Sequence, residues 1–131
     1  MKKPSGVVDL PIGRHPVHRQ KMAVTEKGRA ALTRYEVLAA GPLAALLRVR
    51  IETGRTHQIR VHLAHLGHPV VGDATYGRAR HGLPADLQIP RQMLHAHVLE
   101  ITHPRTGRPL VFTAPPPPDF LAAQKILVGA P

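Results

Sequence analysis

The chain contains no cysteine and no tryptophan among its 131 residues. The lack of cysteine excludes disulfide bonds and thiolate metal sites, and it fits a reducing compartment such as the cytoplasm, where we expect the protein to act. Serine occurs once, at Ser5, so a serine-centred catalytic triad has little support. Two Tyr and two Phe are the only aromatic residues, too few for a platform on which single-stranded bases stack.

Long apolar runs are also missing. No run approaches the ~20 residues that a membrane-spanning helix needs, and Met1-Lys-Lys is followed by Pro-Ser-Gly rather than by an apolar signal segment. We therefore expect neither membrane association nor secretion. A chain of 131 residues is long enough for one core, so we expect residues 1–131 to belong to one domain, with no second domain.

Acidic residues are scarce, with 8 Asp and Glu against 18 Lys and Arg, giving a net charge of +10 and a pI near 11.3. So basic a chain favours a polyanionic partner, because neutralising phosphates releases their counterions. Arginine, whose fork suits phosphate, supplies thirteen of these charges. The charge therefore predicts a nucleic-acid partner; the alternative is a basic protein whose charge serves only solubility.

Alternating apolar residues and turn signals predict several short strands. The expected strands cover residues 7–12, 31–38, 44–52, 94–102 and 109–113. The second and third are joined by Gly41-Pro42 and should pair as a hairpin, and residues 103–107 form the turn of another. Residues 13–21 form a basic loop, and residues 77–90 an irregular one. These features predict an α+β domain with a mainly antiparallel sheet and few helices.

Two helices are expected, the first from a Thr56 cap to about residue 66 and the second over residues 119–127. Gly67 should end the first helix. Its apolar residues at i, i+4 and i+7 should face the core (Ile59, Leu63, Leu66), and its polar residues should lie on other faces (His57, Arg60, His62).

Four of the ten histidines fall within 12 residues (His57, His62, His65, His68), which raises the question of a metal site. Zinc ligands must share a face, and the helical spacing sets His62 apart while His68 lies beyond Gly67. No His-Glu-x-x-His signature is present. We therefore expect no metal and assign these histidines to hydrogen bonding or RNA contact.

Several polar residues near the first helix are candidates for function. Gly54-Arg55-Thr56 can be a structural turn, or it can present N–H groups to a phosphate at the helix start. Arg60 can be a solvated charge, or it can reach a cleft and pair with a carboxylate. Asp73 can bond to its own turn, or it can be an in-chain nucleophile or base. The basic loop is either a solvated loop or an RNA-contact arm (Arg14, His15, His18, Arg19, Lys21).

Several blocks of sequence, in register, resemble the RluA-type RNA pseudouridine synthases. They are Gly-Arg-Thr-His-Gln-Ile-Arg-Val-His at 54–62, Gly-His-Pro-Val-Val-Gly-Asp-Ala-Thr-Tyr-Gly at 67–77 and Leu-His-Ala at 94–96, preceded by Arg-His-Pro-Val-His-Arg-Gln-Lys-Met-Ala-Val at 14–24. The resemblance spans about residues 6–120 and corresponds to the C-terminal part of the catalytic domain. It implies conversion of uridine to pseudouridine in ribosomal or transfer RNA, without cofactor or metal, through attack by an aspartate.

The resemblance also implies roles for individual residues. Arg60 is similar to the arginine that pairs with the catalytic aspartate, and Ile59 to part of the wall of the uracil pocket. The residues of the same motif are expected to contact substrate (Gly54, Arg55, Thr56, His57, Gln58). Asp73 corresponds to a structural loop, which argues against it as nucleophile.

The family's catalytic aspartate lies in a His-Arg-Leu-Asp block, and the chain contains no such block. The active-site tyrosine of a second upstream block is also missing, and Tyr35 does not replace it. We therefore expect a synthase part that is inactive alone, and whose partner is the missing N-terminal half. Two alternatives stay open: a non-catalytic RNA-binding module, and a different active site built from Asp73 and Arg60.

Overall fold

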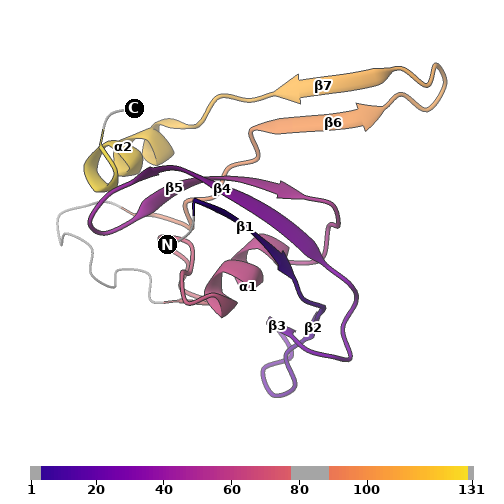
Figure 1. The fold of residues 1–131 in the computed structure, drawn as a ribbon, viewed down its shortest axis with the longest axis horizontal. Helices are drawn as coiled ribbons and strands as arrows, with labels where there is room; N and C mark the ends of the chain where they lie inside the picture. Colours follow the sequence, from indigo (N-terminus) through magenta and orange to yellow (C-terminus); the bar gives the residue numbers. More distant parts are fainter. Residues whose placement is uncertain (1–3, 78–88, 130–131) are drawn as a thin grey trace.

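The computed structural model describes residues 4–77 and 89–129. Within these ranges the elements follow in the order β1–β5, α1, β6, β7 and α2 (Figure 1). Their bounds are β1 Ser5–Asp9, β2 Ile12–Arg14, β3 Met22–Val24, β4 Leu32–Ala40, β5 Ala45–Ile51, α1 Gln58–His65, β6 Val98–Thr102, β7 Pro109–Thr113 and α2 Pro118–Leu127. The predicted loop over residues 77–90 falls mostly on residues 78–88, which lie outside the described ranges.

All strand pairs in the described residues are antiparallel, which confirms the predicted α+β class. The strands form a three-stranded sheet in the order β1-β4-β5 and two separate hairpins, β2-β3 and β6-β7. The predicted hairpin of the second and third strands is confirmed by the pairing of β4 with β5, from Thr33 opposite Ile51 to Ala40 opposite Ala45. In Figure 1, α1 lies on one side of the three-stranded sheet and the β6-β7 hairpin extends on the other.

The single strand predicted over residues 7–12 is wrong, because Leu10 and Pro11 separate two strands, β1 and β2. Proline has no N–H to donate to a ladder, but the antiparallel pairing continues past it, since Ile12 exchanges two backbone hydrogen bonds of 2.9 Å with Arg29, just before β4. Ile12 also pairs with Val24, and this second pairing makes β2 part of a separate hairpin. The pairing of β2 with β3 takes Gly13 and Arg14 out of the predicted basic loop and makes them strand residues. The strand predicted from residue 94 begins only at Val98.

The predicted Thr56 cap of α1 is also wrong. The N-cap is His57, in the left-handed region at φ 55°, and no side chain caps the helix. The turn before the helix closes on itself instead, since Gln58 N–H donates to the Arg55 carbonyl at 3.1 Å. The predicted end is confirmed: Gly67, at φ 86°, follows the C-cap, and the N–H groups of Gly67 and His68 donate to Ala64 and Leu63.

The face of α1 that packs on the sheet differs from the predicted one. Leu66 is 39% exposed, whereas Gln58 and His62 are 3% and 0% exposed and lie beside Val61 and Leu63. The helix therefore packs on β3 and β4 with a buried face that is half polar.

The buried apolar core is small and has two parts in the described residues. One joins Ile12, Ala31 and Val61 beneath α1, and the other joins Ala123 and Leu127 of α2. Neither described helix is long and apolar enough to cross a membrane.

Candidate functional site

Gln58 fixes the start of α1 to the sheet through all of its polar side-chain atoms. Its Oε1 accepts hydrogen bonds from the Thr53 hydroxyl at 2.7 Å and from Arg55 N–H at 3.0 Å. Its Nε2 donates to the Leu32 carbonyl at 2.9 Å and to the Thr33 hydroxyl oxygen at 3.0 Å. The Gln58 side chain, which is predicted to contact substrate, therefore uses both of its polar atoms to hold the loop and the helix together.

His62 continues this polar network one turn further along α1. Its Nδ1 lies 2.8 Å from the Thr33 hydroxyl and its Nε2 lies 2.8 Å from the Leu10 carbonyl. A carbonyl can only accept, so Nε2 carries the proton and Nδ1 accepts from Thr33, whose oxygen accepts from Gln58. Every buried side-chain polar atom in the described residues has a partner, and such a network fixes one orientation of the helix on the sheet.

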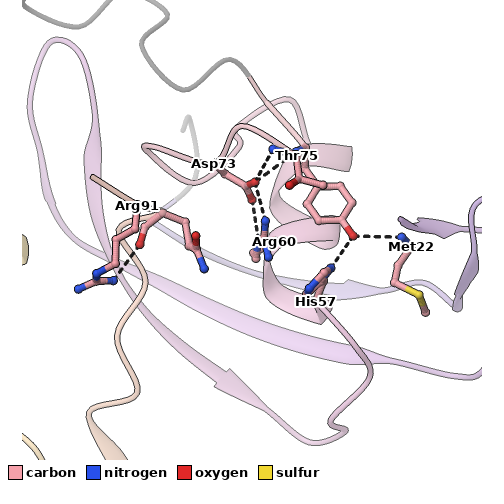
Figure 2. Close-up of polar contacts among 8 residues, drawn as sticks. Met22, His57, Arg60, Asp73, Thr75 and Arg91 are labelled. Atoms are coloured by element: carbon pink, nitrogen blue, oxygen red, sulfur yellow. Dashed lines mark hydrogen bonds and ion pairs between the residues drawn. The ribbon is translucent and has the colours of Figure 1, made fainter. Parts of the chain in front are cut away.

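Arg60 and Asp73 form the most buried ion pair among the described residues (Figure 2). Arg60 Nε donates to Asp73 Oδ2 at 2.8 Å and Nη2 donates to Oδ1 at 2.9 Å. Oδ1 also accepts from the backbone N–H groups of Thr75 and Tyr76. The Asp73 side chain is fully buried and that of Arg60 is 14% exposed.

Both hypotheses for these residues are therefore partly met: Arg60 does pair with a carboxylate, and Asp73 does bond to its own turn. Asp73 accepts four hydrogen bonds and has no access to solvent, an arrangement that suits a structural carboxylate and not a nucleophile. Arg60 keeps its Nη1, which makes no hydrogen bond within the described residues.

The pKa values of the pair follow from these contacts. Burial raises the pKa of the Asp73 carboxyl, but the hydrogen bonds from Arg60 and from the N–H groups of Tyr76 and Thr75 outweigh it, so the pKa lies below its usual value. The hydrogen bond to Asp73 raises the pKa of Arg60. Both groups are charged at neutral pH.

Tyr76 joins the ion pair to the start of α1 and to the basic loop. Its hydroxyl accepts from Met22 N–H at 3.0 Å and lies 2.7 Å from His57 Nδ1 (Figure 2). Its ring lies 5.1 Å from the Arg60 guanidinium carbon and 5.7 Å from Lys21 Nζ. Partial desolvation and the charge of Arg60 lower the pKa of His57.

Sequence reasoning missed Tyr76 as the centre of this site. The available signal was its place in Gly-Asp-Ala-Thr-Tyr-Gly, three residues after Asp73, as one of only two tyrosines. The contact to Met22 spans 54 positions and has no counterpart in local sequence.

The basic loop is a compact exposed turn at the end of the β2-β3 hairpin. His15 Nδ1 accepts from the N–H groups of Val17 and His18, and Arg14 Nη1 donates to the Arg19 carbonyl at 2.9 Å. Lys21, at the end of the loop, places its ammonium group next to Tyr76. The loop therefore adjoins the Arg60 site, although its role in RNA contact stays a prediction.

The remaining motif residues lie around the helix start. Gly54 and Thr56 are exposed, and the Arg55 side chain donates to the Ala30 carbonyl at 2.9 Å. Ile59 is half-buried and lines a groove of about 1710 Å³ between β5, the end of α1, β6 and α2. The described residues contain no group of three His, Asp or Glu placed to hold a metal ion.

Comparison with known proteins places these observations in a family context. The sequence profile described as RNA pseudouridylate synthase matches residues 1–65. The chain is 48% identical over 129 residues to "Ribosomal large subunit pseudouridine synthase D" of Nitrosomonas europaea, covering 96% of this chain and 38% of that protein. It is 52% identical over 116 residues to "Uncharacterized RNA pseudouridine synthase" of Chloroflexus aurantiacus, covering 88% of this chain and 35% of that protein.

A solved structure agrees with the sequence comparison. "Human RNA Pseudouridylate Synthase Domain Containing 1" superposes with a TM-score of 0.72 at 33% identity, over 88% of this chain and 49% of that one. The chain therefore spans 38% of the length of the Nitrosomonas relative and 49% of the human chain.

Proposed function

The chain belongs to the RNA pseudouridylate synthase family, and on this premise we propose that it supplies the arginine and part of the RNA-binding surface for converting uridine to pseudouridine. The named relatives favour ribosomal RNA of the large subunit as the substrate, over transfer RNA. We further propose that residues 1–131 form part of one catalytic domain, act in the cytoplasm and need no cofactor.

The observation that carries this proposal is the fixed position of Arg60. Asp73 holds one edge of its guanidinium, and Tyr76 covers a face of it. Nη1 makes no hydrogen bond within residues 4–77 and 89–129, so it can bind a second carboxylate, which is the role that the resemblance implies for this arginine. A second carboxylate at this point would be kept ionised by the positive charge.

The basic loop supports an RNA partner for the same site. Lys21 contacts Tyr76 beside Arg60, and Arg14 and Arg19 lie on the same hairpin. Cationic groups around a buried arginine suit a phosphate backbone that leads a uridine into the site. We propose these residues, with His15 and His18, as the RNA-contact arm.

The nucleophile must come from elsewhere, since the chain has no His-Arg-Leu-Asp block and Asp73 is fully engaged with Arg60 and its own turn. We therefore propose that this chain is inactive alone and acts with a polypeptide that supplies the aspartate. The alternative of an RNA-binding module without catalysis rests on the same basic arm and differs only in the fate of bound RNA.

A chimera tests the proposal directly. This chain replaces the matching region of the Nitrosomonas relative, and tritium release is followed from large-subunit ribosomal RNA labelled at uridine C5. We expect release by the chimera, loss of at least about 100-fold with Arg60→Gln, and none by this chain alone. Full release by the Arg60→Gln chimera would refute the assignment of Arg60.

The non-catalytic alternative predicts a different pattern. The chimera would bind RNA with a steep salt dependence and release no tritium, whereas the unaltered relative would release it. Replacing Arg14, Arg19 and Lys21 together by Gln should reduce the slope of log K against log salt by about 2–3. An unchanged slope would remove the arm from the RNA interface.

A further inference from the structure

The turn that joins β6 to β7 is held by its own polar groups. His103 Nδ1 accepts hydrogen bonds from the backbone N–H groups of Arg105 at 3.1 Å and Thr106 at 3.2 Å. The Thr106 hydroxyl accepts from Arg108 N–H at 3.3 Å, and His103 N–H donates to the Arg108 carbonyl at 2.8 Å. Gly107, at φ 70°, supplies the left-handed residue that the turn requires. These contacts hold the turn in one backbone conformation.

The same turn presents two arginines without a counterion. Arg105 and Arg108 are exposed, and neither side chain makes an ion pair or a hydrogen bond within residues 4–77 and 89–129. The only acidic residue from Val98 to Thr113 is Glu100, outside the turn. Two unpaired guanidinium forks on an ordered turn suit the oxygens of phosphate groups.

The structure of this turn repeats that of the basic loop. In the loop, His15 Nδ1 accepts from the N–H groups of Val17 and His18, two and three residues further along, and His103 does the same in the β6-β7 turn. Each turn begins with a His-Pro pair and lies at the end of a two-stranded hairpin. Because the basic loop is the proposed RNA-contact arm, the second turn has the same means of binding the same kind of ligand.

We propose that the β6-β7 turn is a second RNA-contact site, in which Arg105 and Arg108 bind phosphate groups of the RNA backbone. In Figure 1 the hairpin extends on the side of the three-stranded sheet opposite α1, and the turn is its outer end. Since α1 carries Arg60, the turn would bind RNA beyond the nucleotides at Arg60. Phosphate contacts of this kind position the RNA and read no bases. The inference rests on the proposed function and adds a binding site to it.

The competing partner for two exposed arginines is an acidic protein. The centre of a protein–protein interface is rich in aromatic and apolar residues, whereas residues 103–108 contain no large apolar side chain. A net charge of +10 also attracts RNA to the chain as a whole. The composition of the turn therefore favours RNA.

The test is a filter-binding titration of labelled large-subunit ribosomal RNA with this chain over a series of salt concentrations. Replacing Arg105 and Arg108 together by Gln should reduce the slope of log K against log salt by about 1–2, as expected for two phosphate contacts. Lys125→Glu is the control, because it removes the same net charge from an exposed position on α2, at the opposite end of the view in Figure 1. It should change the slope by less than about 0.5.

The role of His103 is tested by a conservative variant. His103→Ala removes the acceptor that fixes the turn, so it should weaken RNA binding about threefold or more by making the arginines less ordered. His103→Asn should restore most of the affinity, because an Asn side chain can accept from the backbone two residues further along. Equal weakening by Ala and Asn would contradict this positioning role. Far-ultraviolet circular dichroism checks that each variant is folded.

The chimera gives an independent readout of the same site. A contact remote from the reacting atoms is made equally in the ground state and in the transition state, so the double arginine variant should raise KM and leave kcat within about twofold. A lower activity with unchanged RNA binding would instead assign the turn to an acidic protein partner and overturn the proposal.

Three other results also overturn the RNA site: no RNA binding by the parent chain, an unchanged slope in the double variant, or an equal change in Lys125→Glu. The two proposals fail separately. A selective change of slope beside an inactive chimera would leave the RNA site standing and refute the function. An active chimera whose KM and salt slope are unaffected by the double variant would do the reverse.

Discussion

The sharpest energetic prediction concerns Asp73→Asn. The substitution removes the carboxylate from a fully buried position and leaves the Arg60 side chain, 14% exposed, without its counterion. Breaking a buried ion pair by removing one partner costs about 3–5 kcal/mol, because a buried charge is left uncompensated. Since Arg60 keeps some access to water, we expect about 2–4 kcal/mol of the free energy of unfolding to be lost.

The measurement is urea unfolding at pH 7, followed by circular dichroism, for the parent chain, Asp73→Asn and the control Glu52→Gln. Glu52 also accepts a hydrogen bond from an arginine, Arg34 Nε at 2.9 Å, but the two side chains are 56% and 50% exposed. An exposed pair contributes about 0–1 kcal/mol. Equal losses for the two substitutions would refute the view that burial gives the Arg60–Asp73 pair its stabilising effect.

The pH dependence gives a second readout of the same pair. The pKa of Asp73 is lowered in the folded chain, so its stabilising contribution is complete above the unfolded pKa of about 3.9. It is lost as pH falls from there through the lower folded pKa. Asp73→Asn should therefore flatten the rise of stability with pH in this acidic window. An unchanged slope would mean that the carboxylate is not selectively stabilised in the folded state.

Three further predictions concern the contacts around the site. Gln58→Leu should lower the free energy of unfolding, measured in urea, by about 2–4 kcal/mol, because it leaves buried donors and acceptors unpaired. A loss below 1 kcal/mol, on the order of one ordinary hydrogen bond, would contradict a stabilising role for the Gln58 network. Gly67→Ala should lower the free energy of unfolding by about 1–2 kcal/mol, because Gly67 has φ 86°. Gly54→Ala is the control, since the space around Gly54 is equally open, and it should leave stability unchanged or slightly raised. Equal effects of the two substitutions would exclude backbone strain as the cause. Tyr76→Phe should increase the hydrogen-exchange rate of Met22 N–H, which loses its acceptor, and unchanged protection would show that this bond contributes nothing.

The strands and the end of α1 were predictable because their signals are local. Alternation in residues 44–52 and the Gly41-Pro42 turn predict the β4-β5 hairpin, and Gly67 predicts the helix end. The error at residues 7–12 came from an apolar run that contains Pro11. The pairing runs on past Pro11 to Ile12 and Arg29, and the second pairing of Ile12 with Val24, which makes β2 part of another hairpin, has no signal in the local pattern.

The buried face of α1 could not be predicted from apolar periodicity, because two polar residues, Gln58 and His62, are buried on it. His62 reaches Thr33 and Leu10, which lie 29 and 52 positions away, and these partners make burial of an imidazole favourable. The same holds for the site: Arg60 and Asp73 were both singled out from sequence, but their pairing depends on the turn after Gly67 folding back onto α1.

The second role that we propose for Arg60 would explain why a carboxylate within this chain already binds it. An arginine intended for a nucleophile on another segment would be left half-buried and unpaired until that segment arrived, at a cost of several kcal/mol. Asp73 removes this cost by binding the Nε and Nη2 edge, and among the described residues it leaves Nη1 without a hydrogen bond, as the proposed second carboxylate requires. On the proposed function, the fold around α1 would form first, and the nucleophile would then dock onto an arginine that is already oriented and charged.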